Sequence, residues 1–128
     1  MDIRTHRRID PALCGFPLEL SPGRSTVRLE TTEMMSADER ELVHGGFVFG
    51  MADYAAMLAV NDPNVVLGAA ETRFTAPVRV GETLEARAVI GEENGRKRQV
   101  DVSVRNQENE VFTGRFTCFI PDRHVFDR

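Results

Sequence analysis

The pattern of apolar and polar residues divides the chain into a helical part and parts with the period of strands. Almost every residue from Phe47 to Val60 is apolar, and Asp53 is the one charged residue of this run. A helix that is apolar on nearly every side must be buried on nearly every side. The residue before Pro63 disfavours helical backbone, so the helix should end close to Asp62. One long buried helix is therefore predicted, beginning at Gly45.

Downstream of this helix, apolar residues alternate with polar ones, as they do in strands with one buried face. Strands are predicted over four ranges: 65–80 with a bend at Ala76-Pro77, 83–91, 97–106 and 111–121. Asn94-Gly95 is typical of a tight hairpin turn, and residues 107–110 are a second turn candidate.

Upstream of the helix the pattern is shorter and less regular. Residues 16–32 predict either one strand interrupted by a turn at Ser21-Pro22-Gly23 or two short strands. Ser36 and Glu39 have the spacing of a capping box, so a short helix or a turn is expected within residues 34–43. The order of elements is strand, long helix, then a run of antiparallel strands.

Length and composition are those of one ordinary globular domain. The chain has 128 residues, of which 41% are hydrophobic and 28% charged, enough to bury a single core. We predict one α+β domain over residues 1–128, with residues 1–14 as an N-terminal extension and 122–128 as a tail. A single sheet of this size leaves part of the helix and one edge uncovered, which favours a dimer.

Charge and cysteine usage narrow the function classes. A net charge of −4 gives no general attraction to nucleic acid or to an anionic membrane. Cys14 and Cys118 are isolated thiols, which indicates a reducing compartment, and residues 1–10 resemble neither a secretory signal nor an anchor. The three histidines lack metal-ligand spacing. We expect a cytoplasmic protein with no metal, no nucleic-acid partner and no membrane partner.

Two stretches carry a resemblance to a known family. The run LVHGGFVFGMAD at residues 42–53, with FTAPVRVGETL at residues 74–84, resembles the hotdog-fold acyl-coenzyme A (acyl-CoA) thioesterases. The similarity covers about residues 15–120, and the phenylacetic-acid-degradation (PaaI-like) type is the subgroup it most resembles. The resemblance implies a hotdog fold, in which a five- to six-stranded antiparallel sheet wraps a long central helix. It also implies a homodimer or homotetramer with active sites at the seam between two subunits.

The resemblance implies roles for three residues in hydrolysis of an acyl-CoA to the free acid and CoA. The backbone N–H of Gly45 would bind the thioester carbonyl oxygen, since a helix start offers unpaired N–H groups and glycine lets the substrate approach. Asp53 of the facing subunit would act as general base or nucleophile. His44 would shape the loop or touch the substrate. A tight turn at His44 and a purely structural Asp53 are the alternative interpretations.

Further residues are candidates for substrate contacts. The cations at 96–98 are either a solvated hairpin end or ligands of the CoA phosphates, and the apolar candidates are either packing residues or pocket lining. Asn61 and Thr72 could help to position a water. The substrate-binding candidates are Gly46, Phe47, Met57, Thr72, Arg96, Lys97 and Arg98.

Two other functions remain open at this point. One is a non-catalytic hotdog protein that binds or senses acyl-CoA, although a sensor would be expected to carry a DNA-binding segment and none fits before residue 15. The other is a hotdog enoyl-CoA hydratase or dehydratase, in which His44 and Asp53 would act as a pair. No cofactor is expected, since CoA is part of the substrate. The preferred acyl chain is left open.

Overall fold

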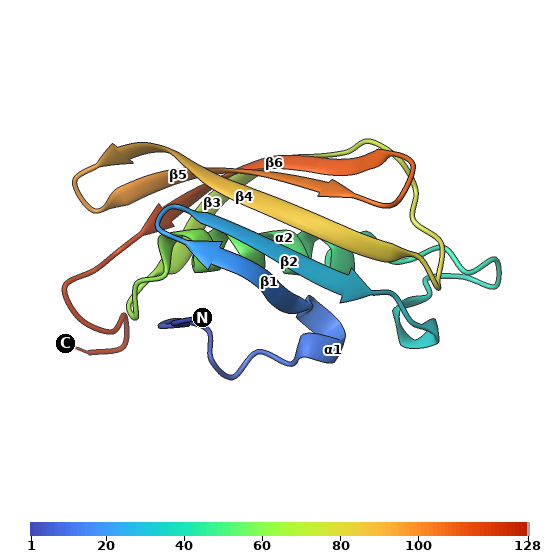
Figure 1. Cartoon of the computed structure of the whole chain (residues 1–128), viewed down its shortest axis with the longest axis horizontal. Coiled ribbons are helices and arrows are strands. Elements are labelled where there is room, and N and C mark those ends of the chain that lie inside the picture. Colours follow the sequence, from blue (N-terminus) through green and yellow to red (C-terminus); the bar gives the residue numbers. More distant parts are fainter. Residues whose placement is uncertain (128) are drawn as a thin grey trace.

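A long helix lies against one curved antiparallel sheet in the computed structural model, which describes residues 1–127 (Figure 1). The helix is α2 (Gly45–Val60), and the sheet has six strands in the order β1-β2-β4-β5-β6-β3. The architecture is therefore the one that the resemblance implies. The remaining elements are α1 (Pro11–Cys14), a 3-10 helix (Glu33–Met35), β1 (Phe16–Ser21), β2 (Arg24–Glu30), β3 (Val66–Phe74), β4 (Thr83–Asn94), β5 (Lys97–Arg105) and β6 (Glu110–Phe119).

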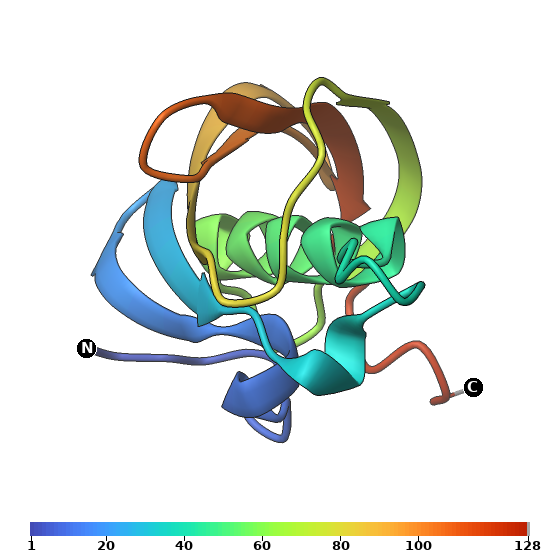
Figure 2. The ribbon, with the colours of Figure 1, turned by 90° about the vertical axis from the view of Figure 1, so that its right-hand side faces the viewer.

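Helix α2 owes its position to burial on most of its circumference. The sheet arches over the helix (Figure 2), and the buried residues of α2 include Met51, Met57 and Leu58. On β2, the buried Ser25 hydroxyl donates a hydrogen bond of 2.6 Å to the carbonyl oxygen of Ala55 in the middle of the helix. Apolar packing and this buried hydrogen bond together fix the helix against the sheet.

The N-terminal segment covers a further part of α2. The helix ends at Asn61, which adopts a left-handed conformation with φ of 53°, a backbone region that asparagine tolerates better than most residues. The Asn61 side chain accepts a hydrogen bond from the Arg4 N–H and donates one to the Asp2 carbonyl, each 2.8 Å long. Asn61 thus joins the end of the helix to the start of the chain.

Strand β3 is the most exposed strand of the sheet. It pairs only with β6 within the described residues, and all of its residues from Gly68 to Phe74 are exposed. An edge of this length presents unpaired N–H and C=O groups to solvent. The structure therefore has the uncovered edge that the sequence predicted.

Several element limits differ from the prediction. The strand expected over residues 65–80 ends at Phe74, because the next two N–H groups turn to the Val111 carbonyl and Pro77 has no N–H to offer a ladder. The short helix or turn expected within residues 34–43 is present as the end of the 3-10 helix and a turn at Glu39-Arg40, but Ser36 caps no helix, since its hydroxyl donates to the Asp38 carbonyl. Of the two alternatives for residues 16–32, the structure confirms two short strands. Helix α1 was not predicted.

Gly95 has the positive φ of 63° that the predicted hairpin turn needs. Within residues 1–127, no helix combines the length and the hydropathy that crossing a bilayer would need.

Candidate functional site

The start of α2 presents two backbone donors without acceptors. His44 is the N-cap residue, but its side chain makes no capping hydrogen bond. Within residues 1–127, neither the Gly45 N–H nor the Gly46 N–H has an acceptor, whereas the Phe47 N–H bonds to the His44 carbonyl at 3.1 Å. Free N–H groups at the positive end of a helix favour a carbonyl oxygen that develops negative charge.

Gly45 also has a packing reason to be glycine. A Cβ atom placed on Gly45 would lie 3.1 Å from Cε1 of Phe74, at the end of β3. The Phe74 ring packs edge-on against Phe112, with 5.1 Å between the ring centroids, yet Phe74 remains 56% exposed. Glycine at residue 45 therefore leaves room for the Phe74 ring and keeps the space beside the helix start open.

Asp53 is a half-buried carboxyl group in the apolar part of the helix. Its Oδ1 atom is buried and has no hydrogen-bond partner within the described residues. This burial raises the pKa of Asp53 from an ordinary value of 3.8 to about 6. A desolvated carboxylate without hydrogen bonds is a stronger base than a solvated one, so Asp53 has the properties of a general base near neutral pH.

The two cysteines lie near Asp53 but are poor nucleophiles. Burial raises the pKa of Cys118 to about 12, and the negative charge of Asp53 adds to the effect. Burial raises the pKa of Cys14 as well, with smaller contributions from Asp53 and Asp10. Since the thiolate is the reactive form, both thiols are in their unreactive protonated form at neutral pH.

Within one chain, Gly45 and Asp53 are too far apart to act on one bond. They are eight residues apart on a continuous helix, and a rise of 1.5 Å per residue separates them by roughly 12 Å. An oxyanion donor and a base that serve one carbonyl must each lie about 3 Å from their target. His44 and Asp53 are separated by even more, so they form no pair within the chain either.

The predicted substrate-binding residues occupy three different places. His44, Gly46 and Phe47 lie together at the helix start, where the rings of His44 and Phe47 are 6.2 Å apart. Met57 is completely buried in the core. Thr72 is exposed on β3, beside Gly114.

The three cations of the β4–β5 hairpin lie at the other end of the sheet. Lys97 is opposite Phe119 on β6, whereas Phe74, beside Gly45, is opposite Phe112 on the same strand. Phe112 and Phe119 are seven residues apart, which corresponds to roughly 24 Å along β6. Arg96 pairs with Asp122 at 2.6 Å, and Arg98 pairs with Glu93 at 3.3 Å. In one chain, Arg96 and Arg98 are therefore paired locally, Lys97 lies over the Phe119 ring, and all three cations are far from Gly45.

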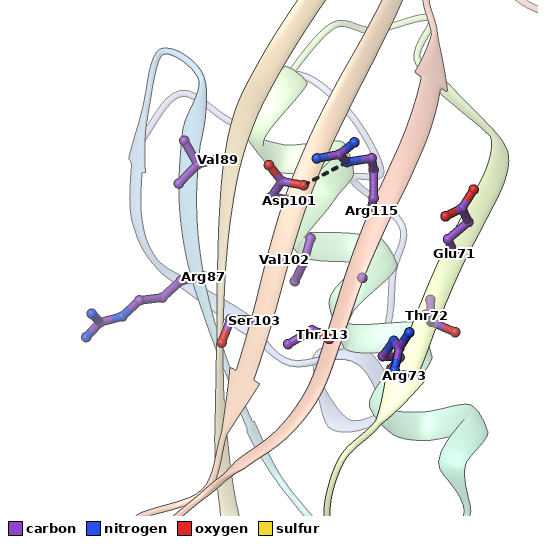
Figure 3. A pocket seen from close by; sticks show the side chains of 11 residues that line it. Glu71, Thr72, Arg73, Arg87, Val89, Asp101, Val102, Ser103, Thr113 and Arg115 are labelled. Atoms are coloured by element: carbon purple, nitrogen blue, oxygen red, sulfur yellow. Dashed lines mark hydrogen bonds and ion pairs between the residues drawn. The ribbon is translucent and has the colours of Figure 1, made fainter.

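A broad hollow of about 910 Å³ lies over β3, β4, β5 and β6 (Figure 3). Its lining includes the charged side chains of Glu71, Arg73 and Arg115, and Arg115 bonds to Asp101 at 3.2 Å. Of the predicted site residues only Thr72 borders it. This hollow is thus separate from the free N–H groups at the helix start.

A smaller cavity of about 390 Å³ adjoins Gly45. Its walls come from the loop before α2, from the first turn of α2, from the end of β3 and residues 75–78 after it, and from Val111 of β6. Phe74 and the residues after it were not among the predicted site residues. The stretch 74–84 contributed to the resemblance, but no local pattern indicates that its start packs beside residue 45.

Comparison with known proteins identifies the family. Residues 41–113 match the family model of the thioesterase superfamily, and this segment contains α2, Gly45 and Asp53. The chain belongs to the thioesterase superfamily and has its hotdog fold.

Curated relatives align with most of this chain. A protein named methylthioribose-1-phosphate isomerase from Aquifex aeolicus is 48% identical over 95% of the chain, which spans only 27% of that protein. The transcription factor FapR from Caldanaerobacter subterraneus is 30% identical over 80% of the chain, which spans 52% of FapR. The chain thus spans about a quarter of the length of the first relative and about half of the length of the second.

Solved structures agree more closely in length. An uncharacterized protein from Pyrococcus horikoshii is 50% identical, with a TM-score of 0.97 over 99% of this chain and 98% of that one. The PaaI protein of the E. coli phenylacetic acid degradation operon is 25% identical, with a TM-score of 0.80 over 88% of this chain and 83% of that one.

Proposed function

We propose that this protein hydrolyses an acyl-CoA thioester to a free acid and CoA, at sites shared between two copies of the chain. In each site, the Gly45 N–H of one copy binds the thioester oxygen, and Asp53 of the other copy acts as the base. The observation that carries the proposal is the desolvated, unpartnered carboxyl of Asp53 in a chain that has a free N–H pair at the start of the same helix. Membership of the thioesterase superfamily supports it.

The proposed reaction needs one water molecule and no cofactor. The Asp53 carboxylate takes a proton from the water while the water oxygen attacks the thioester carbonyl carbon. The carbonyl oxygen becomes negatively charged and accepts a hydrogen bond from the Gly45 N–H. The C–S bond then breaks, and the CoA sulfur leaves and takes up the proton, so that the carboxylate is regenerated.

Two copies are needed because of the separation of roughly 12 Å along the helix. The exposed β3 edge offers a way for two copies to meet. If two β3 strands pair antiparallel, the Val66 end of one copy lies beside the Phe74 end of the other. This pairing would also bring the hairpin cations of one copy, Arg96, Lys97 and Arg98, toward the helix start of the other, where they could bind CoA phosphates.

The subgroup is part of the proposal as well. We assign the protein to the PaaI-like type, supported by the similar fold of E. coli PaaI and by an aspartate as the helix acid. We place it in the cytoplasm, in keeping with its two free cysteines.

The test is thioester hydrolysis by the wild-type chain and by Asp53→Asn, followed with a thiol reagent. Asp53→Asn should lower kcat by about 100-fold to 10,000-fold, the usual contribution of a general base. For the wild type, kcat/KM should rise with pH through about 6, where Asp53 ionises. Asp101→Asn, a matched substitution at an exposed position of β5, should leave kcat and the pH dependence of kcat/KM unchanged. An Asp53→Asn protein with full activity would exclude the proposed mechanism.

A second candidate is binding of acyl-CoA without hydrolysis. The 30% identity to FapR, whose name denotes a transcription factor, favours it because a regulator needs no turnover. Titration calorimetry combined with the thiol assay separates the two functions. Binding of an intact acyl-CoA with no thiol release over hours would support this second candidate.

A further inference from the structure

We propose that Arg28, Arg87 and Arg105, on the face of the sheet turned away from α2 (the outer face), bind a small molecule through its phosphate monoester group. The three arginines line a cavity of about 330 Å³ over β2, β4 and β5. Their side chains point away from α2, because the alternate residues of these strands are the buried ones. The cavity therefore lies on the opposite face of the sheet from Gly45 and Asp53, and its lining comes from one chain.

The strand register places the three arginines around one glutamate. Arg28 is opposite Glu85 on β4, and Glu85 is opposite Arg105 on β5. Arg87 follows Glu85 by two residues and shares its face of the sheet. Since opposite side chains have Cβ atoms about 5 Å apart, Glu85 lies between three guanidinium groups. Glu85 is the one acid in the lining, so the site is cationic in a chain whose net charge is −4.

Glu85 satisfies only one of the three guanidinium groups. The Arg87 guanidinium donates two hydrogen bonds to Oε1 of Glu85, at 3.1 and 3.3 Å. The Arg28 guanidinium lies 3.8 Å from the other carboxylate oxygen, which is beyond hydrogen-bond distance. The Nε atom of Arg28 is buried and has no acceptor within residues 1–127. A buried donor without an acceptor is unusual in a folded protein, and it favours a ligand that accepts hydrogen bonds.

Arg105 is the third cation, and it has no ion pair among the described residues. Glu110, which is opposite Arg105 on β6, instead accepts a hydrogen bond of 3.0 Å from the Ser103 hydroxyl. Thr83 and Gln107 border the same cavity and supply uncharged donors. An anion in the cavity would thus meet guanidinium, hydroxyl and amide donors together.

The charge and the acceptors of a phosphate monoester match this lining. Every lining residue is polar or charged, which favours a hydrophilic ligand. A phosphate monoester carries a charge of about −1.5 to −2 at neutral pH and has three strong acceptor oxygens, so it balances the excess positive charge. Guanidinium groups bind such oxygens in pairs. Arg87 and Ser103 also border the larger hollow (Figure 3), so the rest of the ligand has room beyond its phosphate.

Titration calorimetry of the whole chain at low salt tests the binding of phosphate. The probes are inorganic phosphate, glycerol 3-phosphate and adenosine monophosphate, and the controls are glycerol, adenosine and dimethyl phosphate. Inorganic phosphate should bind with a Kd of about 0.1 to 1 mM, an affinity that a ligand of so few atoms can reach. Dimethyl phosphate, a diester with a single negative charge, should bind at least about tenfold more weakly. Glycerol and adenosine should not bind.

The probes also distinguish the sources of the phosphate group. Equal affinities for the three probes would show that the phosphate alone is recognised. A preference of more than about tenfold for adenosine monophosphate over inorganic phosphate would show that the ligand is a nucleotide whose base adds contacts of its own. Either result supports a site for phosphate monoesters.

Variants of the lining should change the affinity for inorganic phosphate in opposite directions. Arg28→Gln and Arg105→Gln each remove charged donors and should weaken binding by at least about fivefold. Glu85→Gln removes the carboxylate that competes for the same guanidinium groups, so it should tighten binding by about twofold to fivefold. Arg24→Gln replaces an exposed arginine of β2 that does not line the cavity, and as the matched control it should leave the affinity unchanged.

Three results would overturn the proposal. One is a wild-type chain that binds no phosphate, or that binds it no better than Arg28→Gln and Arg105→Gln do. Another is equal affinity for dimethyl phosphate, which would indicate a site for phosphodiesters. The third is an assembly, seen by light scattering, that Arg105→Gln dissociates while phosphate fails to bind, because the outer face would then pack against a second copy. All of these measurements report binding or assembly, so they do not depend on thioester hydrolysis.

Discussion

The two edge strands of the sheet differ in how they are protected. Strand β1 has six residues, includes Pro17, and has a register shift in its pairing with β2. Strand β3 has nine residues and no proline, and it pairs with β6 without a shift from Ala69 to Phe74. Short edges, prolines and irregular pairing are the usual means by which a sheet avoids adding another strand. The β1 edge has these features. The β3 edge lacks them, so it can pair regularly with a further strand.

The difference suggests why the site residues lie where they do. Helix α2 is covered by the N-terminal segment on the side that Asn61 holds, while the β3 side has an exposed strand and an exposed Phe74. If the β3 edges of two copies pair, the least protected part of the molecule becomes the place where a site is completed.

Blocking the β3 edge should have the largest effect. Neighbouring residues of a strand direct their N–H groups to opposite sides. One of Ala69→Pro and Ala70→Pro therefore removes an N–H from the free edge, and the other removes an N–H that faces β6 and should lower the melting temperature more. The variant with the higher melting temperature should be monomeric, with kcat/KM reduced by at least about 100-fold. Glu19→Pro on β1 should leave the dimer and its activity intact. Light scattering measures the oligomeric state and the thiol assay measures kcat/KM. An active monomer would refute shared sites.

Mixing two inactive variants should restore part of the activity. Asp53→Asn and Gly45→Val each damage one half of a shared site, so a mixed dimer has one doubly damaged site and one intact site. After subunit exchange at equal amounts, about half of the dimers are mixed, and activity should return to about a quarter of the wild-type value. If Gly45 and Asp53 acted within the same chain, the mixture would stay inactive. Each variant alone, taken through the same subunit-exchange procedure, is the control.

Removing the Asp53 charge should raise stability above pH 6. Folding raises the pKa of Asp53 to about 6, so between about pH 4 and pH 6 the folded state binds more protons than the unfolded state. Wild-type stability therefore falls as pH rises through this window. Asp53→Asn does not titrate, so its melting temperature should exceed that of the wild type by more at pH 8 than at pH 4. Equal differences at both pH values would show that Asp53 is not desolvated.

Loosening the protected side of α2 should have the smallest effect. Asn61→Gly keeps the left-handed backbone but loses both hydrogen bonds to the N-terminal segment, which should cost about 1 to 2 kcal/mol of unfolding free energy. Asn61→Ala adds the strain of a positive φ and should cost about 1 kcal/mol more. Urea unfolding measures both variants. Their acyl-CoA hydrolysis should match that of the wild type, since this side lies away from the β3 edge at which we propose that a second copy pairs.

Local patterns determined the elements of the fold. The apolar run up to Val60 and the following Asp62-Pro63 predicted the long helix to within about two residues, and Asn94-Gly95 predicted its hairpin. These signals depend on neighbouring residues, whose periodicity and backbone preferences can be read directly. Strand β3 was predicted to reach residue 80 and ends at Phe74, because alternation alone does not reveal which N–H groups turn away from the ladder.

The residues that could carry the chemistry are evident from the amino-acid sequence: glycines at a helix start and one acid in an apolar run. The folded chain adds that Phe74 lies against Gly45, that β3 is the exposed edge, and that the hairpin cations lie far from the helix start. These contacts could not be predicted because periodicity reports which face of an element is buried, but not what covers it. That depends on strand order and register, which bring together segments that are distant in the chain.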